Sequence, residues 1–342
     1  MKARGPDSQV CGVGIYDRAM PLTTRFTELF GVRHPIVCGG MTRVGTPGLI
    51  AAVAEAGALG FMPAHNSPTP EDLVKDIARV RDLTDQPFGV NFTILPARKP
   101  PPWEEYMQAT VESGVTAIET AGQNPEPYLP LFRAGGVKVL HKCTSVRHSL
   151  KAERVGVDAV SIDGFEAAGH PGEDDTPGLV VIPALADKIK IPFIASGGFA
   201  DGRGLAAALA LGAQGISMGT RFMCTVEAPI HENVKNQIVA NDERSTNLIF
   251  RQLRNTGRYA KNGVTDEIIR ILNEGGTYED VAHLSSGEKG AIVLATGDLE
   301  AGVWCAGQTQ GLIFDIPTVD EIVTRIVEQA EAVIDRMAGL RR

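Results

Sequence analysis

The chain has 342 residues, a formal net charge of -8 at pH 7 and a hydrophobic fraction of 43%. This length can form one large domain with an insertion, or two ordinary domains. The negative charge gives no support to nucleic acid or an anionic membrane as a partner. No apolar run of about 18 residues occurs, so the sequence predicts no transmembrane helix.

The cysteines are few and scattered, and none forms a CxxC pair. There are five of them: Cys11, Cys38, Cys143, Cys224 and Cys305. An odd number without paired spacing supports neither a disulfide framework nor a zinc site, and it is typical of a reducing, cytoplasmic setting. Residues 1–22 lack the apolar segment of a secretory signal, and we expect them to form a flexible tail.

Short apolar runs recur along the chain, each followed by a glycine or polar turn and then by a helical pattern. The runs predict strands at Pro35–Met41, Ala58–Ala64, Phe88–Ile94, Ala117–Ala121, Lys138–Thr144, Ala159–Gly164, Phe193–Gly198 and Gly215–Phe222. The patterns between them predict helices at Pro47–Ala56, Pro70–Leu83, Trp103–Ser113, Pro127–Ala134, Val146–Val155, Ile182–Lys188 and Gly202–Leu211. Thr69 before Pro70 is typical of a helix start. Glycines mark three helix ends, at Gly114, Gly156 and Gly212.

The strands read as continuous apolar runs, which favours a parallel sheet covered by helices. Eight successive βα units predict a (β/α)8 TIM barrel. The alternative is an open doubly wound sheet, but the chain lacks the GxGxxG turn that opens the first helix of a dinucleotide-binding sheet.

Residues 226–299 interrupt the repeat. They are polar, and we expect helices at Arg244–Arg258 and Asp266–Glu274 within a helical insertion that packs over the barrel mouth. The barrel itself is then formed by residues 23–225 and 300–342. The predicted last helix, Val319–Met337, closes it with apolar residues at four-residue spacing: Ile322, Ile326, Ala330 and Ile334.

Two glycine turns follow the last two predicted strands. They are Ser196-Gly197-Gly198 and Met218-Gly219-Thr220. In a barrel these turns form a phosphate site from backbone N–H groups, which glycine lets approach the anion closely. Either turn alone could be an ordinary βα connection, but their combination favours phosphate binding.

Further polar residues and glycines lie at the ends of other strands, which converge on the active-site face of a barrel. They include Gly39, Gly40, Met41, Asn91, Thr93, Lys142 and Asp163. A lysine on a buried strand is costly unless it is paired or meets a ligand. The N1–C2=O edge of a flavin, which gains negative charge on reduction, is a fitting partner for Lys142. The alternative is a structural ion pair with Asp163.

His170 lies in a loop between glycines, after Ala168 and Gly169. This position favours a general base or a substrate contact over a core histidine. Glu173, Asp174 and Asp175 follow, but a solvated acidic loop explains them equally well. No catalytic triad and no metal-binding constellation can be read from the sequence.

These residues together resemble the nitronate monooxygenase (2-nitropropane dioxygenase) superfamily, which is FMN-dependent. The resemblance extends from about Phe26 to the C-terminus. It is strongest toward the bacterial NADH:quinone reductase branch, in the segments 141–144, 163–166, 169–175 and 195–204. Residues 166–170 read Glu-Ala-Ala-Gly-His, whereas nitronate monooxygenases usually have Glu-Ala-Gly-Gly-His.

The resemblance implies a role for each matching residue. Met41 and Asn91 would contact the flavin ring or ribityl chain, with Thr93 nearby, and Lys142 would lie at the pyrimidine edge. His170 matches the catalytic base of the family. The other implied FMN contacts are Gly39, Gly40, the backbones of Ala168 and Gly169, and a phosphate site at Ser196, Gly197, Gly198, Gly219 and Thr220.

The function implied by the resemblance is an FMN-dependent NADH:quinone reductase. The alternatives are a nitronate monooxygenase that consumes O2, a flavin-dependent enoyl-thioester reductase, and a non-catalytic FMN-binding protein. The partners would be small molecules, namely NADH and a quinone or nitronate, and a homodimer is compatible with this interpretation.

A proline-rich segment follows the third predicted strand and would lie at the barrel mouth. Prolines fix φ and remove backbone donors, so the segment should be stiff and extended. We expect it to act as a lid that holds the NADH pyrophosphate. The alternative is a plain surface connection. The candidate contact residues are Pro96, Arg98, Lys99, Pro100 and Pro102.

Overall fold

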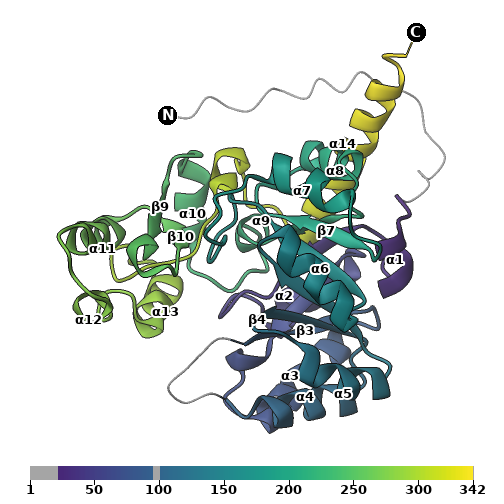
Figure 1. Ribbon diagram of the computed structural model, residues 1–342, viewed down its shortest axis with the longest axis horizontal. Coiled ribbons are helices and arrows are strands. Elements are labelled where there is room, and N and C mark those ends of the chain that lie inside the picture. Colours follow the sequence, from purple (N-terminus) through teal and green to yellow (C-terminus); the bar gives the residue numbers. More distant parts are fainter. Residues whose placement is uncertain (1–21, 95–100, 342) are drawn as a thin grey trace.

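The computed structural model describes residues 22–94 and 101–341. In this part of the chain, parallel strands close into a barrel in the order β1 to β8, with β1 also paired to β8. The TIM barrel prediction is therefore confirmed (Figure 1). The barrel strands are β1 (Ile36–Cys38), β2 (Leu59–Pro63), β3 (Gly89–Ile94), β4 (Ala117–Gly122), β5 (Lys138–Cys143), β6 (Ala159–Asp163), β7 (Phe193–Ser196) and β8 (Ile216–Met218).

Helices cover the outside of the barrel. They are α2 (Pro47–Glu55), α3 (Pro70–Leu83), α4 (Trp103–Glu112), α5 (Leu129–Ala134), α6 (Val146–Val155), α7 (Gly178–Ala186), α8 (Gly202–Ala210) and α14 (Val319–Ala338). Short 3-10 turns lie at Ala64–Asn66, Glu126–Tyr128 and Gln308–Leu312. The predicted helix signals are confirmed: Thr69 caps α3 through Asp72 N–H, and the three terminal glycines have positive φ.

The interior of the barrel is filled from its amino-terminal end. Phe26 and Phe30 of α1 (Arg25–Phe30) pack against inward-facing residues such as Phe61 and Leu140. A capping box at Thr24 starts this helix, and the Thr24 hydroxyl also donates to the Gln214 carbonyl at 2.8 Å. This end is therefore a packed core, and the open cavities lie at the carboxyl ends of the strands.

Helix α14 closes the barrel against α8 and α2. Three of its predicted core residues, Ile322, Ile326 and Ala330, are buried, whereas Ile334 is 38% exposed. Gly202 makes the close approach possible, because a Cβ there would lie 2.3 Å from the Ile326 carbonyl oxygen.

Several predicted boundaries near the site are wrong. Strands β1 and β7 end at Cys38 and Ser196 rather than at Met41 and Gly198. Strand β8 ends at Met218 rather than at Phe222, because the chain turns at Gly219 into the short helix α9 (Thr220–Met223). Helix α7 begins at Gly178, four residues before the predicted start. The Glu166 carboxylate accepts from Gly178 N–H at 3.0 and 3.1 Å and so stabilises that earlier start.

The region between α9 and α14 is not purely helical. It contains α10 (Glu232–Ala240), α11 (Gly263–Asn273), α12 (Tyr278–Val281) and α13 (Gly287–Thr296). The helix predicted at Arg244–Arg258 is wrong. That segment forms most of an antiparallel pair, β9 (Thr246–Ile249) with β10 (Gly257–Ala260), joined by a 3-10 turn at Arg251–Leu253.

Backbone geometry explains this error. Phe250 and Arg254 have φ of 62° and 52°, which no helix interior tolerates, and Ile249 and Tyr259 suit strands. The second predicted helix, Asp266–Glu274, is confirmed within α11, which begins at an Asn262 capping box. Figure 1 shows α11, α12 and α13 gathered to one side of the barrel.

Among the described residues, no helix is long and apolar enough to cross a membrane. The tail predicted at residues 1–22 falls almost wholly outside the described part of the chain.

Candidate functional site

Two cavities open at the carboxyl ends of the strands. The His170 cavity has a volume of about 600 Å³ and includes Asn91, Thr93, His148, Lys151 and His170 in its lining. The Gly219 cavity, of about 410 Å³, is lined by barrel turns and by part of α13. The residues common to both are Gly40, Lys142, Ala168 and Gly169. The cavities therefore meet at Lys142 and at one stretch of backbone.

The structure brings most of the predicted site residues to these cavities. Those that line only the Gly219 cavity are Gly39, Met41, Ser196, Gly197, Gly198, Gly219 and Thr220. Pro102 lines neither cavity and is instead the N-cap of α4. Pro96, Arg98, Lys99 and Pro100, and with them the lid prediction, lie outside the described residues.

Glu119 is a site residue that the sequence analysis missed. It lies fully buried on β4, and its Oε2 accepts from Gly40 N–H at 2.9 Å and from Asn91 Nδ2 at 2.7 Å. Burial raises the pKa of Glu119, against the effects of the Lys142 charge and of these two hydrogen bonds. The available signal was a carboxylate inside an otherwise apolar strand.

Asn91 has both ends of its side-chain amide fixed. Its Nδ2 donates to Glu119, and its Oδ1 accepts from the Thr93 hydroxyl at 3.0 Å. One N–H of the amide is therefore left for a ligand. Gly40 allows this arrangement, because a Cβ at that position would lie 2.3 Å from the Asn91 side chain.

Lys142 lies on β5 with its Nζ 4.0 Å from Asp163. The Asp163 charge raises the pKa of Lys142, with a further contribution from Glu119, while burial opposes the rise. The ion pair expected as the alternative role is therefore present, at a long distance. This ion pair leaves Lys142 in the lining of both cavities, so a fixed positive charge lies where the two cavities meet.

The two glycine turns lie side by side at the Gly219 cavity. Gly197 and Gly198 have φ of 80° and 89°, and a Cβ on Gly219 would have only the Met41 sulfur within 4 Å, at 3.5 Å. The Thr220 hydroxyl accepts from Gly307 N–H at 3.0 Å and can still donate to a ligand.

Helix α8 does not contribute its N-terminus to the part of the Gly219 cavity formed by these two turns. The Asp201 carboxylate caps that end by accepting from Arg203 N–H at 2.9 Å and Gly204 N–H at 3.2 Å. An anion in the Gly219 cavity would therefore meet the Gly198 and Gly219–Thr220 turns rather than the start of α8.

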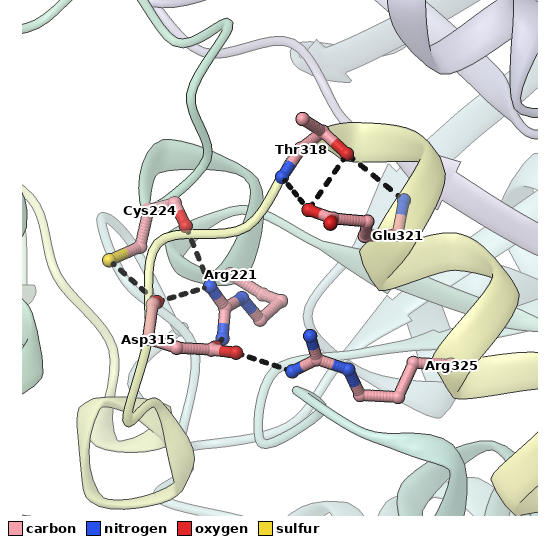
Figure 2. A network of polar contacts seen from close by, with 6 residues as sticks. All are labelled: Arg221, Cys224, Asp315, Thr318, Glu321 and Arg325. Carbon is pink, nitrogen blue, oxygen red and sulfur yellow. Dashed lines mark hydrogen bonds and ion pairs between the residues drawn. The ribbon is translucent and has the colours of Figure 1, made fainter.

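An ion-pair network around the buried Arg221 fixes α9, the helix that begins at Thr220 (Figure 2). Arg221, which is 2% exposed, donates to Asp315 Oδ1 at 3.1 Å and to the carbonyls of Cys224 and Asp315 at 2.6 and 2.8 Å. Arg325 of α14 donates to the other Asp315 oxygen at 2.5 Å. The network ties α9 to the segment that carries Gly307 and to the last helix.

The His170 loop is held by the β10 segment. Gly169 and Arg258 exchange two backbone hydrogen bonds of 3.0 and 2.6 Å. The Arg258 guanidinium also donates to the Phe165 carbonyl at 2.8 Å. His170 is exposed to the cavity, and partial desolvation lowers its pKa, although the Glu173 charge and a hydrogen bond with Asn255 oppose this.

Two of the acidic residues after His170 have structural partners and are not simply part of a solvated loop. Glu173 accepts from the backbone and hydroxyl of Thr256 at 2.7 and 2.6 Å, and Asp175 pairs with Arg251. They anchor the His170 loop to the insertion. Within residues 22–94 and 101–341, no group of three His, Cys, Asp or Glu side chains could hold a metal ion.

Comparisons with known proteins agree with this architecture. The nitronate monooxygenase family model matches residues 23–329. A relative from Rhodococcus jostii (strain RHA1), named (3aS,4S,5R,7aS)-5-hydroxy-7a-methyl-1-oxo-octahydro-1H-indene-4-carboxyl-CoA dehydrogenase, is 31% identical over 94% of this chain and 99% of its own length. A probable nitronate monooxygenase from Staphylococcus saprophyticus is 31% identical over 76% of this chain and 83% of that protein.

A solved structure is similar throughout. FabK from Thermotoga maritima superimposes with a TM-score of 0.86 at 34% identity, covering 93% of this chain and 99% of that one. The family match spans the barrel, both cavities and most of α14. This chain belongs to the nitronate monooxygenase family of flavin-dependent oxidoreductases.

Proposed function

We propose that this chain is an FMN-dependent oxidoreductase that takes hydride from NADH and then reduces a quinone by two electrons. The observation that carries the proposal is the meeting of two cavities at Lys142 and the Ala168–Gly169 backbone. One cavity has the features of a cofactor site, and the other leaves room for a substrate beside it.

The residues of the Gly219 cavity fit a flavin mononucleotide. The turns at Gly198 and Gly219 would hold one phosphate by backbone N–H groups, and the Thr220 hydroxyl would donate to it. Lys142 would place its charge at the pyrimidine edge, and Asn91 would offer its remaining N–H to the ring. A single phosphate cradle without a dinucleotide turn favours FMN over FAD. When bound, FMN supplies the hydride-accepting atom.

The His170 cavity would hold the substrates in turn. Its volume of about 600 Å³ lies within the range that drug-sized ligands occupy, and much of its lining is polar. The residues of this cavity would orient a substrate against the cofactor, and the Gly169–Arg258 contact would keep the loop in place while they do so.

A nitronate monooxygenase is the second candidate, and the position of His170 favours it. Desolvation lowers the pKa of this histidine, which favours the neutral imidazole that a general base needs. Two relatives of this chain carry the names nitronate monooxygenase and carboxyl-CoA dehydrogenase. The second name adds CoA thioesters to the substrate classes that should be tested.

Anaerobic rapid mixing of the holoprotein with NADH separates these functions. Fast loss of the flavin absorbance, followed by its return on adding a quinone, is the result we expect. No reaction with NADH under these conditions, together with oxygen uptake when an alkyl nitronate is added to the aerated protein, would replace this proposal with the second candidate.

A further inference from the structure

One wall of the His170 cavity is formed by α6, and nothing in the proposed chemistry uses it. His148, Lys151 and Ala152 of this helix line the cavity. Residues spaced by three and four positions share one face of a helix, so these side chains stand together. We call this face the α6 wall. Ala152 is buried, so the polar side chains of the wall are those of His148 and Lys151.

The α6 wall is electropositive. Lys151 is exposed, and no carboxylate within the described residues lies within ion-pair distance of it. The Arg147 guanidinium lies 3.4 Å from His148 Nε2, which adds a cation beside the wall. His141, at the cavity base, is neutral, because burial and the neighbouring His148 lower its pKa to about 4.

The carboxylates of the cavity and of α6 contact groups other than Lys151. Glu173 accepts two hydrogen bonds from Thr256, and Asp163 faces Lys142. Glu153, on α6 itself, accepts from the backbone N–H groups of Lys190 and Ile191. Within the described residues, none of these carboxylates forms an ion pair with Lys151, so the charge of Lys151 is left unpaired at the α6 wall, although Asp163 and Glu173 also line the cavity.

We propose that the α6 wall is a subsite for the pyrophosphate of a nucleotide-tailed substrate, with Lys151 and His148 as its phosphate-binding side chains. The inference rests on the proposed function, in which the reacting group of the same substrate meets the cofactor near Lys142. An uncharged quinone offers no charge for Lys151 to pair with, whereas a pyrophosphate does. Two substrates share the required chemistry, NADH and a CoA thioester.

The α6 wall suits an anionic tail. Lysine binds phosphate as a point charge, and such charge-assisted hydrogen bonds are stronger than neutral ones. A cavity that runs from Lys142 to the second turn of α6 gives a reactive group and an anionic tail separate contacts. Specificity for the tail would then be independent of the chemical step.

The test compares two charge reversals on one helix in the FMN-loaded protein. Lys151→Glu changes the α6 wall, whereas Arg154→Glu changes an exposed cation of α6 that lines neither cavity. The Kd for NADH is taken from the concentration dependence of anaerobic flavin reduction, and the Kd for free coenzyme A from its perturbation of the flavin spectrum. Lys151→Ala, a milder change, is measured beside them.

We expect Lys151→Glu to raise the Kd for NADH, for coenzyme A or for both by about tenfold or more, which is the loss expected for one charge-assisted contact. The limiting rate of flavin reduction should not change. The Kd values of Arg154→Glu should stay within about twofold of those of wild type, because Arg154 lies outside the cavity. Weaker binding of NADH identifies the dinucleotide as the source of the pyrophosphate. Weaker binding of coenzyme A alone identifies a thioester substrate.

Equal affinities of wild type and both Lys151 variants for both probes would overturn the α6 wall, and normal reduction by NADH would then leave the proposed function standing. Conversely, absence of any reduction by NADH would refute the proposed reductant. A selective loss of coenzyme A binding in Lys151→Glu would still support the phosphate subsite in that case.

Discussion

Glu119 Oε2 accepts a hydrogen bond from Asn91 Nδ2 at 2.7 Å, which links strands β4 and β3 beneath both cavities. The same oxygen accepts from Gly40 N–H, so one buried carboxylate positions two of the groups assigned to the cofactor. Within the described residues, the other oxygen, Oε1, has no hydrogen-bond partner. Glu119 therefore acts as a positioning residue below the site.

Replacement of Glu119 by alanine should lower the free energy of unfolding by about 2–4 kcal/mol. It leaves two buried donors unpaired, and each costs about 1–3 kcal/mol, less some relaxation. Glu119→Gln keeps an acceptor and should cost much less. Urea unfolding of the FMN-free proteins at pH 7 measures both changes. Equal stability of the alanine and glutamine variants would contradict the role of the hydrogen bonds.

The raised pKa of Glu119 also predicts a pH dependence. Above the unfolded value of 4.5, the native state holds the proton more tightly than the unfolded state, so stability falls as pH rises toward the folded pKa. Glu119→Gln should lack this decline. Parallel pH profiles for the two proteins in this window would show that Glu119 does not titrate there.

Gly219→Asp should abolish FMN binding without unfolding the protein. The new Cβ finds space, since only the Met41 sulfur lies within 4 Å, but the carboxylate would repel a phosphate at the cradle. Gly48→Asp, an exposed change in the first turn of α2, is the matched control. Flavin titration followed by fluorescence compares them, and a folded Gly219→Asp protein with wild-type affinity would place the phosphate elsewhere.

His170→Ala should separate the two candidate functions. Hydride transfer from NADH needs no proton acceptor, so anaerobic flavin reduction should continue at close to the wild-type rate. Turnover of nitronates, if His170 is their base, should fall by roughly 100- to 10,000-fold. A comparable loss in the NADH reaction would instead assign the histidine to that step.

The wild-type nitronate reaction should also fail in acid. Because desolvation lowers the pKa of His170, the neutral base persists below the ordinary value of 6.5 and is lost only as pH falls through the lowered value. The pH profile of turnover at low nitronate concentration reports this. An inflection above 6.5 would contradict the environment described for the histidine.

Asp315→Asn should destabilise the protein by about 1–3 kcal/mol through the buried Arg221. This is less than removal of a partner from a fully buried pair, because the Asp315 side chain is 41% exposed. Burial opposes ionisation of Asp315, but the hydrogen bond from Arg325 and the charge of Arg221 outweigh it and lower its pKa. The stabilisation is therefore present above 3.8 and is lost as pH falls through the lower folded value.

Acid unfolding of wild type and Asp315→Asn measures this effect. The two stability curves should converge as Asp315 becomes protonated. A constant gap down to strongly acidic pH would show that the ionised form of Asp315 is not what stabilises α9.

The barrel was predictable because its signals are local. Each apolar run predicts one strand, and each capped helical pattern predicts one helix. Residues such as Thr69 and Gly156 mark the ends of the helices. The segment 244–258 was not predictable in this way. Its strands are set by the positive φ of Phe250 and Arg254 and by pairing with the loop at Gly169, which periodicity does not reveal.

The site follows the same division. Glycines and polar residues at strand ends, such as Gly219 and Lys142, could be found from their position along the chain. Glu119 stands out as a carboxylate inside a strand, but its role could not be read from the sequence, because it depends on donors from Gly40, which follows β1, and from Asn91 of β3 that the closed barrel brings within 3 Å. The α6 wall is likewise a property of three-dimensional packing, since nothing in the sequence of α6 shows which of its faces meets the cavity.

The central claim is that the Gly219 cavity holds one FMN per chain, and the cofactor content of the purified protein tests it most directly. Mass spectrometry of the released cofactor, with absorbance to count it, should find FMN at one equivalent per chain and no FAD. FAD in that extract, or no flavin bound after reconstitution with FMN, would contradict the account.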